Sequence, residues 1–387
     1  MILGIERLID GADRKLIEGR RIGLVSNPAS IDSRIRHSAD RLIETGARLT
    51  TLFGPQHGFR SDLQENMIES PHASDARRRL PVYSLYSETR EPTAEMLKDV
   101  DVLVVDLQDV GTRIYTYIYT MANCLRAARK HGRDIIVCDR PNPIGGEQVE
   151  GPALVHGFES FVGQFPIPMR HGLTIGEIAR LFNDEYGINA AVDVVPMEGW
   201  RRTMYYDETG LPWVLPSPNI PTVDTAVVYP GAVLFEGTLL SEGRGTTKPF
   251  ELVGAPWIDG DRFADAMNAR RLGGVYFRPA IFEPTFHKHT KQSCGGCQIH
   301  VTDRRAFEPL RVAVELLAEF RRQAPAKFAW REPPYEYEHV IPPIDILYGS
   351  DALRKGLDAG RDAAEIAAPW RRDEDSFRAL REKYLFY

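Results

Sequence analysis

The sequence predicts an α/β protein in which a Rossmann-like parallel sheet domain carries a second, smaller α+β C-terminal domain. Three observations support this fold class. From Arg21 onward, short apolar runs alternate with segments of helix length, the pattern of a parallel sheet with helices on its faces. The 387 residues are too many for one ordinary hydrophobic core. A proline-rich run, Leu215–Pro221, separates two halves of different pattern.

The first half supplies the strands of the predicted sheet. Most of its short runs are apolar at both odd and even positions, as expected of strands buried on both faces. The predicted strands are Ile22–Ser26, Leu49–Phe53, Val82–Tyr86, Val100–Leu107, Ile135–Asp139, Phe161–Met169 and Ala191–Pro196. Helical spacing predicts helices at Ser38–Thr45, Ala94–Lys98 and Thr116–Lys130, and a capping box formed by Thr174 and Glu177 begins another.

The proline-rich run is the predicted domain boundary. Prolines fix an extended chain that cannot join a helix, so we expect residues 1–215 to form the Rossmann-like domain and residues 222–387 to form the α+β domain. The second half is predicted to contain an apolar run at Val227–Leu234, helices at Asp261–Arg271 and Pro309–Arg322, strands at Val275–Phe282 and Gln298–Thr302, and a mostly helical tail. We expect this half to close a cleft over the strand ends of the first.

Composition disfavours several classes of protein. Hydrophobic residues at 43% and charged residues at 26% are typical of a soluble globular chain. A net charge of −6 disfavours a nucleic-acid partner, because phosphate binding needs a basic surface. Near the N-terminus, Glu6, Arg7 and Asp10 interrupt any apolar run that would serve as a signal or membrane segment, so we expect a cytoplasmic chain with no membrane contact. Four cysteines are too few for a disulfide scaffold.

No cofactor and no metal are predicted. The turn after the first strand reads SNPASIDSR and lacks the glycines that admit a dinucleotide, and no Walker A motif is present. Cys294 and Cys297 have metal or redox spacing, and His287, His289 and His300 lie near them in the sequence. A second CxxC pair is missing, so incidental cysteines in a loop are favoured over a tetrahedral zinc site.

A long polar loop follows the second predicted strand. It carries Gln56, His57, Arg60, Glu65 and Glu69. In open α/β sheets, ligands bind outside the carboxyl ends of the strands, where loops present polar groups. Taken alone, the loop is equally well explained as a solvated surface segment. Because further polar loops follow other strands of the same sheet, we favour the interpretation that this loop forms one wall of a ligand site.

The fourth and fifth strands end in similar loops, held by proline and glycine turns. The fourth leads into DLQDVGTR, with Asp109 and Arg113, and the fifth into DRPNPIGG, with Asp139, Arg140 and Asn142. A structural ion pair explains Asp109 and Arg113 at least as well as substrate contact does. For Asp139, the convergence of three strand-end loops favours a functional role.

Four more residues complete the candidate site. Glu150 follows the fifth-strand loop, and convergence favours a functional role for it as well. His171 is either a general base or a packing residue beside a helix N-terminus. Glu242 and Arg244 belong to a glycine-rich loop whose backbone freedom and charges suit an anionic or hydroxyl-rich ligand better than a plain turn.

Several long motifs resemble the NamZ (formerly YbbC) family. They are GLVSNP from Gly23, FGPQHG from Phe53, PVYSLY from Pro81, DLQDVGTRIYTYIY from Asp106, DRPNPIGG from Asp139, EGP from Glu150, EGT from Glu236, SEGRGTTKPF from Ser241 and KYLFY from Lys383. The likeness covers nearly the whole chain. It implies an exo-β-N-acetylmuramidase, a glycoside hydrolase that releases terminal N-acetylmuramic acid from the non-reducing end of peptidoglycan fragments. The implied cleft lies between the two domains, and the implied role is cell wall recycling.

The resemblance also implies the substrate partner, a small amino sugar that contains N-acetylmuramic acid. Its lactyl group carries a carboxylate, which a guanidinium group binds with two parallel hydrogen bonds. Arg60, Arg140 and Arg244 are the candidates for this contact. The remaining candidates for substrate binding are Asp109, Arg113, Asp139, Asn142, His171 and Glu242.

One position departs from the family pattern. The usual loop reads GPEHG and its glutamate is a favoured catalytic group, whereas this chain has Gln56. An amide cannot transfer a proton as a carboxyl group does, and ordinary glycoside hydrolysis needs two carboxyl groups. Either Glu65 or Glu69 supplies the missing group, or Gln56 orients water or the acetamido group of the sugar. A third possibility is that the acetamido group is the nucleophile, so that one protein carboxylate suffices.

We therefore predict a cytoplasmic hydrolase in which Glu150 has one carboxylate role and Glu65 or Glu69 the other. His57, Asp139 and Arg140 are predicted to position the substrate or tune the acid. The alternative is a non-catalytic, or differently specific, amino-sugar-binding protein of the same fold, for which Gln56 is the main argument.

Overall fold

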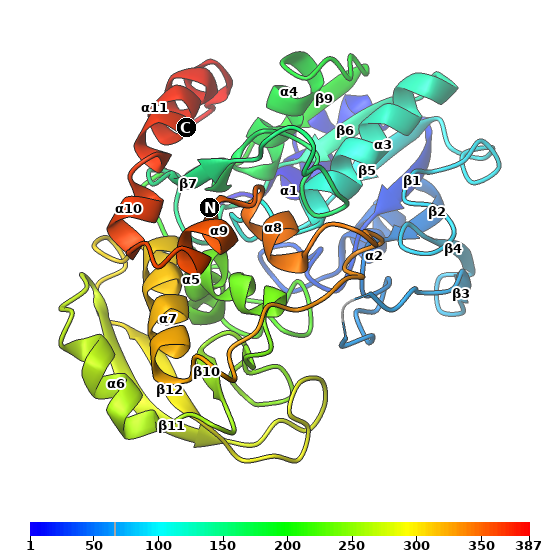
Figure 1. Cartoon of the computed structure of the whole chain (residues 1–387). Coiled ribbons are helices and arrows are strands. Elements are labelled where there is room, and N and C mark those ends of the chain that lie inside the picture. The colour runs from blue at the N-terminus through cyan, green and yellow to red at the C-terminus, as the bar shows by residue number, and fades with distance from the viewer. Residues whose placement is uncertain (66) are drawn as a thin grey trace.

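A seven-stranded sheet forms the centre of the first half of the molecule, in the upper right of Figure 1. The computed structural model describes residues 1–65 and 67–387. The strands lie in the order β3-β4-β2-β1-β5-β6-β9. Their bounds are β1 (Arg21–Val25), β2 (Arg48–Gly54), β3 (Ala73–Asp75), β4 (Leu80–Ser84), β5 (Val102–Val105), β6 (Asp134–Cys138) and β9 (Val192–Val195).

The sheet is parallel except at one edge, where β3 pairs with β4 in the antiparallel sense. Without β3, the strands follow the chain order 3-2-1-4-5-6 across the sheet, which is the Rossmann order. The order reverses between β1 and β5. Sheets of this kind bind ligands outside the carboxyl ends of the strands at that reversal.

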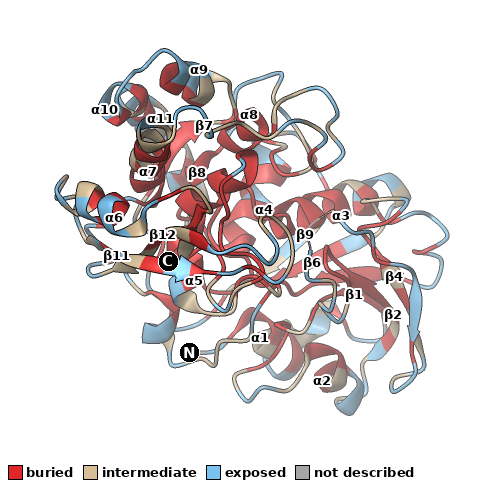
Figure 2. Cartoon of the chain, turned by 60° about the horizontal axis from the view of Figure 1, so that its bottom comes forward, coloured by how far each residue is buried: buried red, intermediate tan, exposed pale blue. Residues whose placement is uncertain are grey.

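Helices cover both faces of the sheet. On β1, Leu24 packs into a cluster with residues of α1 (Gly4–Asp10) and α2 (Ser38–Glu44). Its neighbour Val25 packs into the cluster that contains α3 (Tyr117–His131) and α4 (Ile175–Asp184). Adjacent residues of a strand point to opposite faces, so β1 carries apolar side chains toward both helical layers. Figure 2 shows the buried strands at the centre of this half.

The second half is a smaller α+β part with a three-stranded antiparallel sheet in the order β10-β12-β11. A further two-stranded sheet, β7-β8, lies beside the C-terminal tail, which runs from orange to red in Figure 1. The elements are β7 (Glu150–Ala153), β8 (Pro168–Arg170), α5 (Val223–Ala232), β10 (Leu252–Ala255), α6 (Gly260–Asn268), β11 (Val275–Phe282), β12 (Cys294–Val301), α7 (Pro309–Gln323), α8 (Pro343–Tyr348), α9 (Ala352–Asp358), α10 (Ala363–Ala367) and α11 (Trp370–Arg381). Short 3-10 helices lie at η1 (Ala12–Leu16), η2 (Tyr206–Thr209), η3 (Val233–Gly237) and η4 (Glu382–Tyr384).

One hydrophobic cluster joins the two halves. It extends from Val105 of the large sheet and Leu125 of α3 to Phe263 of α6 and Leu316 of α7. The second half is therefore packed against the α3 side of the large sheet. The predicted split into residues 1–215 and 222–387 stays a prediction.

The predicted fold class is confirmed, and the main strands lie within a few residues of their predicted positions. The capping box of Thr174 and Glu177 is present at the start of α4. Three local predictions differ. Residues 94–98 form turns, because so short a segment lacks the length to stabilise a helix. The predicted strand at Phe161–Met169 is reduced to β8, and Cys294 and Cys297 lie buried in β12 rather than in a loop.

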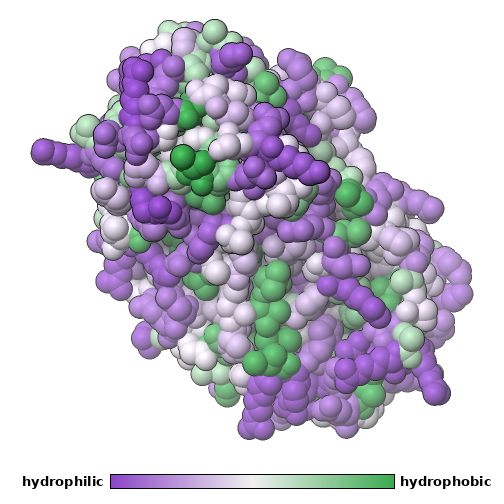
Figure 3. Space-filling view, turned by 90° about the horizontal axis from the view of Figure 1, so that it is seen from below, coloured by the Kyte–Doolittle hydropathy of each residue, from purple (hydrophilic) through white to green (hydrophobic). Residues whose placement is uncertain are grey.

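On the face shown in Figure 3, polar residues predominate. Apolar residues form small separate patches, the largest of them a narrow strip below the middle of the view. No helix in residues 1–65 and 67–387 combines the length and the apolar character needed to cross a membrane.

Candidate functional site

A small buried cavity lies beyond the carboxyl ends of β2 and β5. Its volume is about 40 Å³. The first half contributes Gln56 and His57 from the loop after β2, residues 114–117 before and at the start of α3, Val162, and Ser217, Asn219 and Ile220 of the proline-rich run. The second half contributes Tyr229, Glu236, Arg244, Phe250, Tyr335 and Glu336. The cavity thus lies near the reversal of strand order, with walls from both halves.

Hydrogen bonds hold the proline-rich run against this edge of the sheet. Asn27, just after β1, donates from Nδ2 to the hydroxyl oxygen of Tyr117 at 2.8 Å and to the carbonyl oxygen of Pro216 at 2.7 Å. The run predicted as a linker therefore forms a wall of the cavity.

Gln56 is fixed at the floor of the cavity by a tight turn. Gly54 ends β2 where an added Cβ would lie 2.5 Å from the backbone nitrogen of Phe59, and His57 and Gly58 both have positive φ. The side-chain oxygen of Gln56 accepts a hydrogen bond from the Thr116 hydroxyl at 2.8 Å. Its amide nitrogen donates to Oε1 of Glu336 at 3.2 Å.

Glu336 is a buried carboxyl group from a distant part of the chain. Only 3% of the residue is exposed. Its Oε2 accepts a hydrogen bond from the hydroxyl of Tyr86, just after β4, at 2.8 Å. Burial, together with the nearby charge of Glu236, raises the pKa of Glu336 to about 7. This carboxyl group therefore exchanges its proton near neutral pH.

Glu236 and Arg244 form a buried ion pair in the same cavity. Nη2 of Arg244 lies 2.7 Å from Oε1 of Glu236, and the Tyr335 hydroxyl donates to Oε2 of Glu236 at 2.7 Å. Within the described part of the chain, Nε and Nη1 of Arg244 have no hydrogen-bond partner, although Oε1 of Glu242 lies 3.5 Å from Nε. Arg244 thus has donor groups left for a ligand.

Glu242 lies behind Arg244 rather than in the cavity wall. Its carboxylate contacts Nζ of Lys288 at 2.7 Å and Nδ1 of His287 at 3.1 Å. Burial opposes ionisation, but Lys288, His287 and Arg244 outweigh it and lower the pKa of Glu242. Glu242 therefore neutralises the cations around it.

His57 faces the cavity as a neutral imidazole. Its Nδ1 lies 2.7 Å from the carbonyl oxygen of Leu63, so this nitrogen carries the proton. Burial lowers the pKa of His57 to about 4. Near neutral pH it is suited to positioning or accepting hydrogen bonds, not to donating a catalytic proton.

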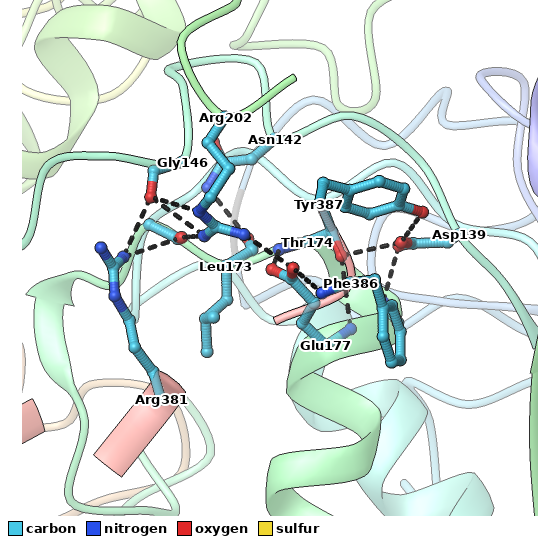
Figure 4. Close-up of polar contacts among 12 residues, drawn as sticks. Asp139, Asn142, Gly146, Leu173, Thr174, Glu177, Arg202, Arg381, Phe386 and Tyr387 are labelled. Atoms are coloured by element: carbon cyan, nitrogen blue, oxygen red, sulfur yellow. Dashed lines mark hydrogen bonds and ion pairs between the residues drawn. The ribbon is translucent and has the colours of Figure 1, made fainter. Parts of the chain in front are cut away.

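The structure places two predicted substrate residues, Asp139 and Asn142, near the C-terminal end of the chain and outside the cavity lining (Figure 4). Asp139 accepts hydrogen bonds from the Thr174 hydroxyl at 2.8 Å, the Gly176 amide at 2.8 Å and the Tyr387 hydroxyl at 2.7 Å. Burial raises the pKa of Asp139 to about 7. Asn142 donates to the carbonyl oxygen of Leu173 at 2.9 Å. These side chains anchor the end of the chain and the start of α4.

Two arginines that were predicted to bind substrate instead bind groups within the protein. Arg140 forms a buried ion pair with Asp106, 2.6 Å between Nε and Oδ1. Arg113 donates to backbone carbonyl oxygens instead of to Asp109, so the predicted alternative of an ion pair between these two is wrong. Its acceptors are Pro152 at 3.1 Å, Ile167 at 3.2 Å, Leu347 at 3.0 Å and Tyr348 at 2.7 Å. Arg113 thereby ties α8 to the first half.

Asp109 and His171 contact each other beneath the surface. Oδ2 of Asp109 accepts from the Gly111 amide at 2.7 Å and lies 3.4 Å from Nε2 of His171. Nδ1 of His171 accepts from the Leu173 amide at 3.1 Å. Neither side chain lines the cavity, and the packing interpretation of His171 agrees with this geometry.

Glu150 also lies outside the cavity. It is on β7, which packs against α7 and α11, and its Oε1 accepts from the Arg311 amide in the first turn of α7 at 3.0 Å. Burial raises the pKa of Glu150 to about 8. The chain leaves the sheet edge after β6 before it reaches Glu150, so this residue does not join Gln56 as predicted.

The remaining loop candidates point to solvent or to another hollow. Glu65 and Glu69 are exposed, and Glu69 forms a 3.4 Å ion pair with Arg90. Arg60 is exposed beside a separate hollow of about 370 Å³ on the other side of the same loop. Of the predicted residues, the structure brings Gln56, His57 and Arg244 together.

Sequence reasoning missed Glu336 and Tyr86 and gave Glu236 no role. Glu236 belongs to the EGT motif, and the signal that could have identified it is a carboxylate beside a glycine-rich loop. Glu336 lies in an aromatic and proline-rich stretch. Nothing in that local pattern predicts its contact with Gln56, which lies 280 residues away in the sequence.

Fold and cavity together define a class: a two-part α/β protein with Rossmann strand order and an acidic cavity between the large sheet and a smaller C-terminal part. Models of the N-terminal and C-terminal parts of the exo-β-N-acetylmuramidase NamZ match residues 22–224 and 227–387. The chain belongs to the NamZ family. The two matches meet just after the proline-rich run.

Known relatives agree with this placement. The chain is 45% identical over 385 residues to the peptidoglycan β-N-acetylmuramidase NamZ of Bacillus subtilis (strain 168), covering 99% of this chain and 91% of the relative. It is also similar to crystal structures of two DUF1343 family proteins from Bacteroides fragilis NCTC 9343. Their TM-scores are 0.89 at 37% identity and 0.78 at 29% identity, and each match covers 100% of this chain and 98% of the other.

Proposed function

We propose that this chain is a glycoside hydrolase, an exo-β-N-acetylmuramidase that releases terminal N-acetylmuramic acid from the non-reducing end of peptidoglycan fragments. Family membership and the named activity of the Bacillus subtilis relative support the substrate. One structural observation carries the chemistry: Glu236 and Glu336, from distant segments, line one buried cavity with Gln56. Glycoside hydrolysis needs a proton donor and a second group that stabilises or attacks the sugar carbon.

Arg244 is the residue that we propose for the lactyl carboxylate of the sugar. It lines the cavity and is 6% exposed, and its Nε and Nη1 have no hydrogen-bond partner within the described residues. Arg140 is held by Asp106, and Arg60 lies beside another hollow. Nε faces Glu242, so Nη1 is the donor left for a ligand, and its cationic N–H binds a carboxylate more strongly than a neutral sugar hydroxyl.

Gln56 is proposed to act through its amide. Thr116 fixes the amide oxygen and Glu336 receives a hydrogen bond from the amide nitrogen, so the side chain has one defined orientation. An amide held in this way orients a neighbouring carboxyl group, a water molecule or the acetamido group of the sugar. Participation of the acetamido group as nucleophile is compatible with this arrangement.

Substrate entry requires the cavity to widen. About 40 Å³ holds little more than one or two water molecules, whereas ligand pockets usually have roughly 300–1,000 Å³. We propose that the turn from Tyr335 to Glu338, which carries Glu336, moves outward to admit the sugar and then returns, which restores the contacts of Glu336 with Gln56 and Tyr86. The Arg90 guanidinium lies 3.6 Å from the centre of the Tyr337 ring, a contact that favours the present position of the turn.

The proposed setting is recycling of small wall fragments in the cytoplasm. A narrow cavity suits the end of a short glycan better than the middle of a polymer. All four cysteines are free thiols, which agrees with a reducing compartment.

The disaccharide MurNAc-GlcNAc tests the proposal. The purified protein is expected to release free N-acetylmuramic acid, and to cleave GlcNAc-GlcNAc, which lacks the lactyl group, much more slowly. Tight binding of MurNAc-GlcNAc in calorimetry without any cleavage would instead establish a sugar-binding protein without this activity.

A further inference from the structure

We propose that Glu336 is the general acid of this site and that Gln56 and Tyr86 are its positioning residues. The inference rests on the proposed function and adds the group that supplies the proton. Its geometrical basis is that one buried carboxyl group lines the cavity while its two oxygens contact side chains from the loops after β2 and β4.

The other titratable groups of the cavity are poorly suited to donating a proton. His57 is neutral near pH 7, and its one N–H is directed at the Leu63 carbonyl. Both oxygens of Glu236 accept hydrogen bonds within the protein, from the cation of Arg244 and from Tyr335. Burial raises the pKa of Tyr115 and Tyr229 above their usual range, so these phenols hold their protons firmly. Glu336 is the carboxyl group that remains.

The surroundings of Glu336 suit an acid that titrates near neutral pH. Burial and the charge of Glu236 raise its pKa, while the hydrogen bonds from Tyr86 and Gln56 and the charge of Arg244 lower it. These opposing effects give a pKa of about 7. An acid with its pKa near the working pH is protonated often enough to donate and acidic enough to transfer.

The proton transfer is balanced over one cycle. The carboxyl group of Glu336 gives its proton to the glycosidic oxygen as the bond from C1 to that oxygen breaks, and the oxygen keeps the bonding electron pair. The leaving sugar departs with a new hydroxyl group. Water then supplies its oxygen to C1, and its released proton returns to the Glu336 carboxylate.

Gln56 keeps this acid in place without competing for its proton. Its amide nitrogen donates to Oε1 of Glu336 at 3.2 Å, and Tyr86 donates to Oε2 at 2.8 Å. A carboxyl group at position 56 would place a second acid beside Glu336, and the two would then share a proton.

The test compares two substrates in Glu336→Gln. MurNAc-GlcNAc has a poor leaving group that needs protonation, whereas the 4-nitrophenyl β-glycoside of N-acetylmuramic acid has a leaving group that does not. We expect kcat/KM to fall by roughly 100- to 10,000-fold on the disaccharide and by less than about tenfold on the nitrophenyl glycoside. The wild-type decline of kcat/KM above about pH 7 is expected to disappear in the variant.

A second variant, Tyr86→Phe, keeps the carboxyl group and removes its 2.8 Å donor. Because this hydrogen bond lowers the pKa of Glu336, the decline of kcat/KM is expected to move to higher pH. Melting temperatures and calorimetric binding of N-acetylmuramic acid check that both variants fold and bind.

Equal losses on the two substrates, or full disaccharide activity in Glu336→Gln, would overturn the assignment of Glu336. A shift of the Tyr86→Phe profile to lower pH, or no shift, would also count against it. A wild-type protein that binds but cleaves neither substrate would overturn the proposed function itself.

Discussion

Two buried glutamates of this chain have raised pKa values and very different surroundings. Burial raises the pKa of Glu336 to about 7 and that of Glu150 to about 8. Glu150 accepts a hydrogen bond from the backbone amide of Arg311 where β7 packs against α7. Glu336 contacts the side chains of Gln56 and Tyr86 at a cavity beyond the strand ends of a Rossmann-type sheet.

The comparison shows how a raised carboxyl pKa should be interpreted. Burial alone disfavours the charged form, so a raised pKa indicates a low-dielectric environment before it indicates catalysis. The position of Glu336 is what supports a function, because two halves of the molecule meet there, at the carboxyl ends of β2 and β4 and near the reversal of strand order. Glu150 lacks that position, although its pKa is shifted further. The following substitutions test this distinction, beginning with the largest expected effect.

Arg244→Lys would test whether the cavity of Glu336 recognises the sugar. Lysine keeps the charge but loses the planar pair of donors. Hydrogen bonds to charged groups contribute about 1.5–3 kcal/mol each, so kcat/KM for MurNAc-GlcNAc is expected to fall by roughly 10- to 100-fold. The matched substrate GlcNAc-GlcNAc, which has no lactyl carboxylate, should lose little. An equal loss on both substrates would assign Arg244 to structure rather than to recognition.

Gln56→Glu would test whether a neighbouring charge changes the pKa of Glu336. The new carboxyl group would lie where the amide now donates to Glu336, and like charges at that distance raise one pKa of the pair. The decline of kcat/KM at alkaline pH is therefore expected to move upward by about one pH unit. Gln56→Met is the control: it removes the hydrogen bond that lowers the pKa of Glu336 without adding charge, so the decline should move upward by less than in Gln56→Glu. An unchanged pH profile in Gln56→Glu would show that Glu336 is not the titrating acid.

These variants bear on how much the sequence could predict. The parallel sheet was predictable because most of its strands carry apolar residues at both odd and even positions, as burial on both faces requires. Gln56, His57 and Arg244 were predictable as cavity residues because each belongs to a turn rich in glycine or proline.

Other parts of the site were not predictable from local patterns. Glu336 reaches the cavity through the fold of the C-terminal half, and its stretch of sequence reads as an ordinary aromatic and proline-rich segment. For Asp139, by contrast, the local pattern predicts a functional role, because this residue directly follows β6 at the carboxyl end of the sheet. In the structure, the hydroxyl of Tyr387, the last residue of the chain, donates a hydrogen bond to it.

Tyr387→Phe would test this structural role of Asp139. The substitution removes a donor to Asp139 and the acceptor of the Met197 amide, which lies 2.6 Å from the Tyr387 hydroxyl. We expect a loss of about 1–3 kcal/mol in the free energy of unfolding, with activity near 25 °C unchanged. The matched control is Tyr384→Phe, because that hydroxyl contacts the exposed Glu185, and the substitution should cost less than about 0.5 kcal/mol in the free energy of unfolding.

The loss in Tyr387→Phe is expected to be larger at pH 8 than at pH 6. The hydrogen bond from Tyr387 lowers a pKa that burial has raised to about 7, so removing it raises the folded-state value further. A carboxyl group whose pKa is raised on folding contributes stability that is present below its unfolded pKa and is lost as the pH rises through the folded one. Denaturant titrations at the two pH values measure the difference. Equal losses at pH 6 and pH 8 would show that the hydroxyl does not stabilise the charged form of Asp139.

Glu150→Gln should have the smallest effect on activity. The amide oxygen still accepts from Arg311, and kcat/KM is expected to stay within about threefold of wild type. Stability is the informative readout. Because the pKa of Glu150 rises from 4.5 to about 8 on folding, wild type loses stability between pH 5 and pH 8, at about 1.4 kcal/mol per unit at most. The variant should lose less over the same interval, and a parallel decline would contradict burial of this carboxyl group.

The most direct test sets the two glutamates against each other in one assay. Release of N-acetylmuramic acid from MurNAc-GlcNAc is measured at pH 6.5 for wild type, Glu336→Gln and Glu150→Gln. We predict a loss of at least 100-fold for Glu336→Gln and less than about threefold for Glu150→Gln. The opposite ranking, with Glu150→Gln inactive and Glu336→Gln active, would contradict the account.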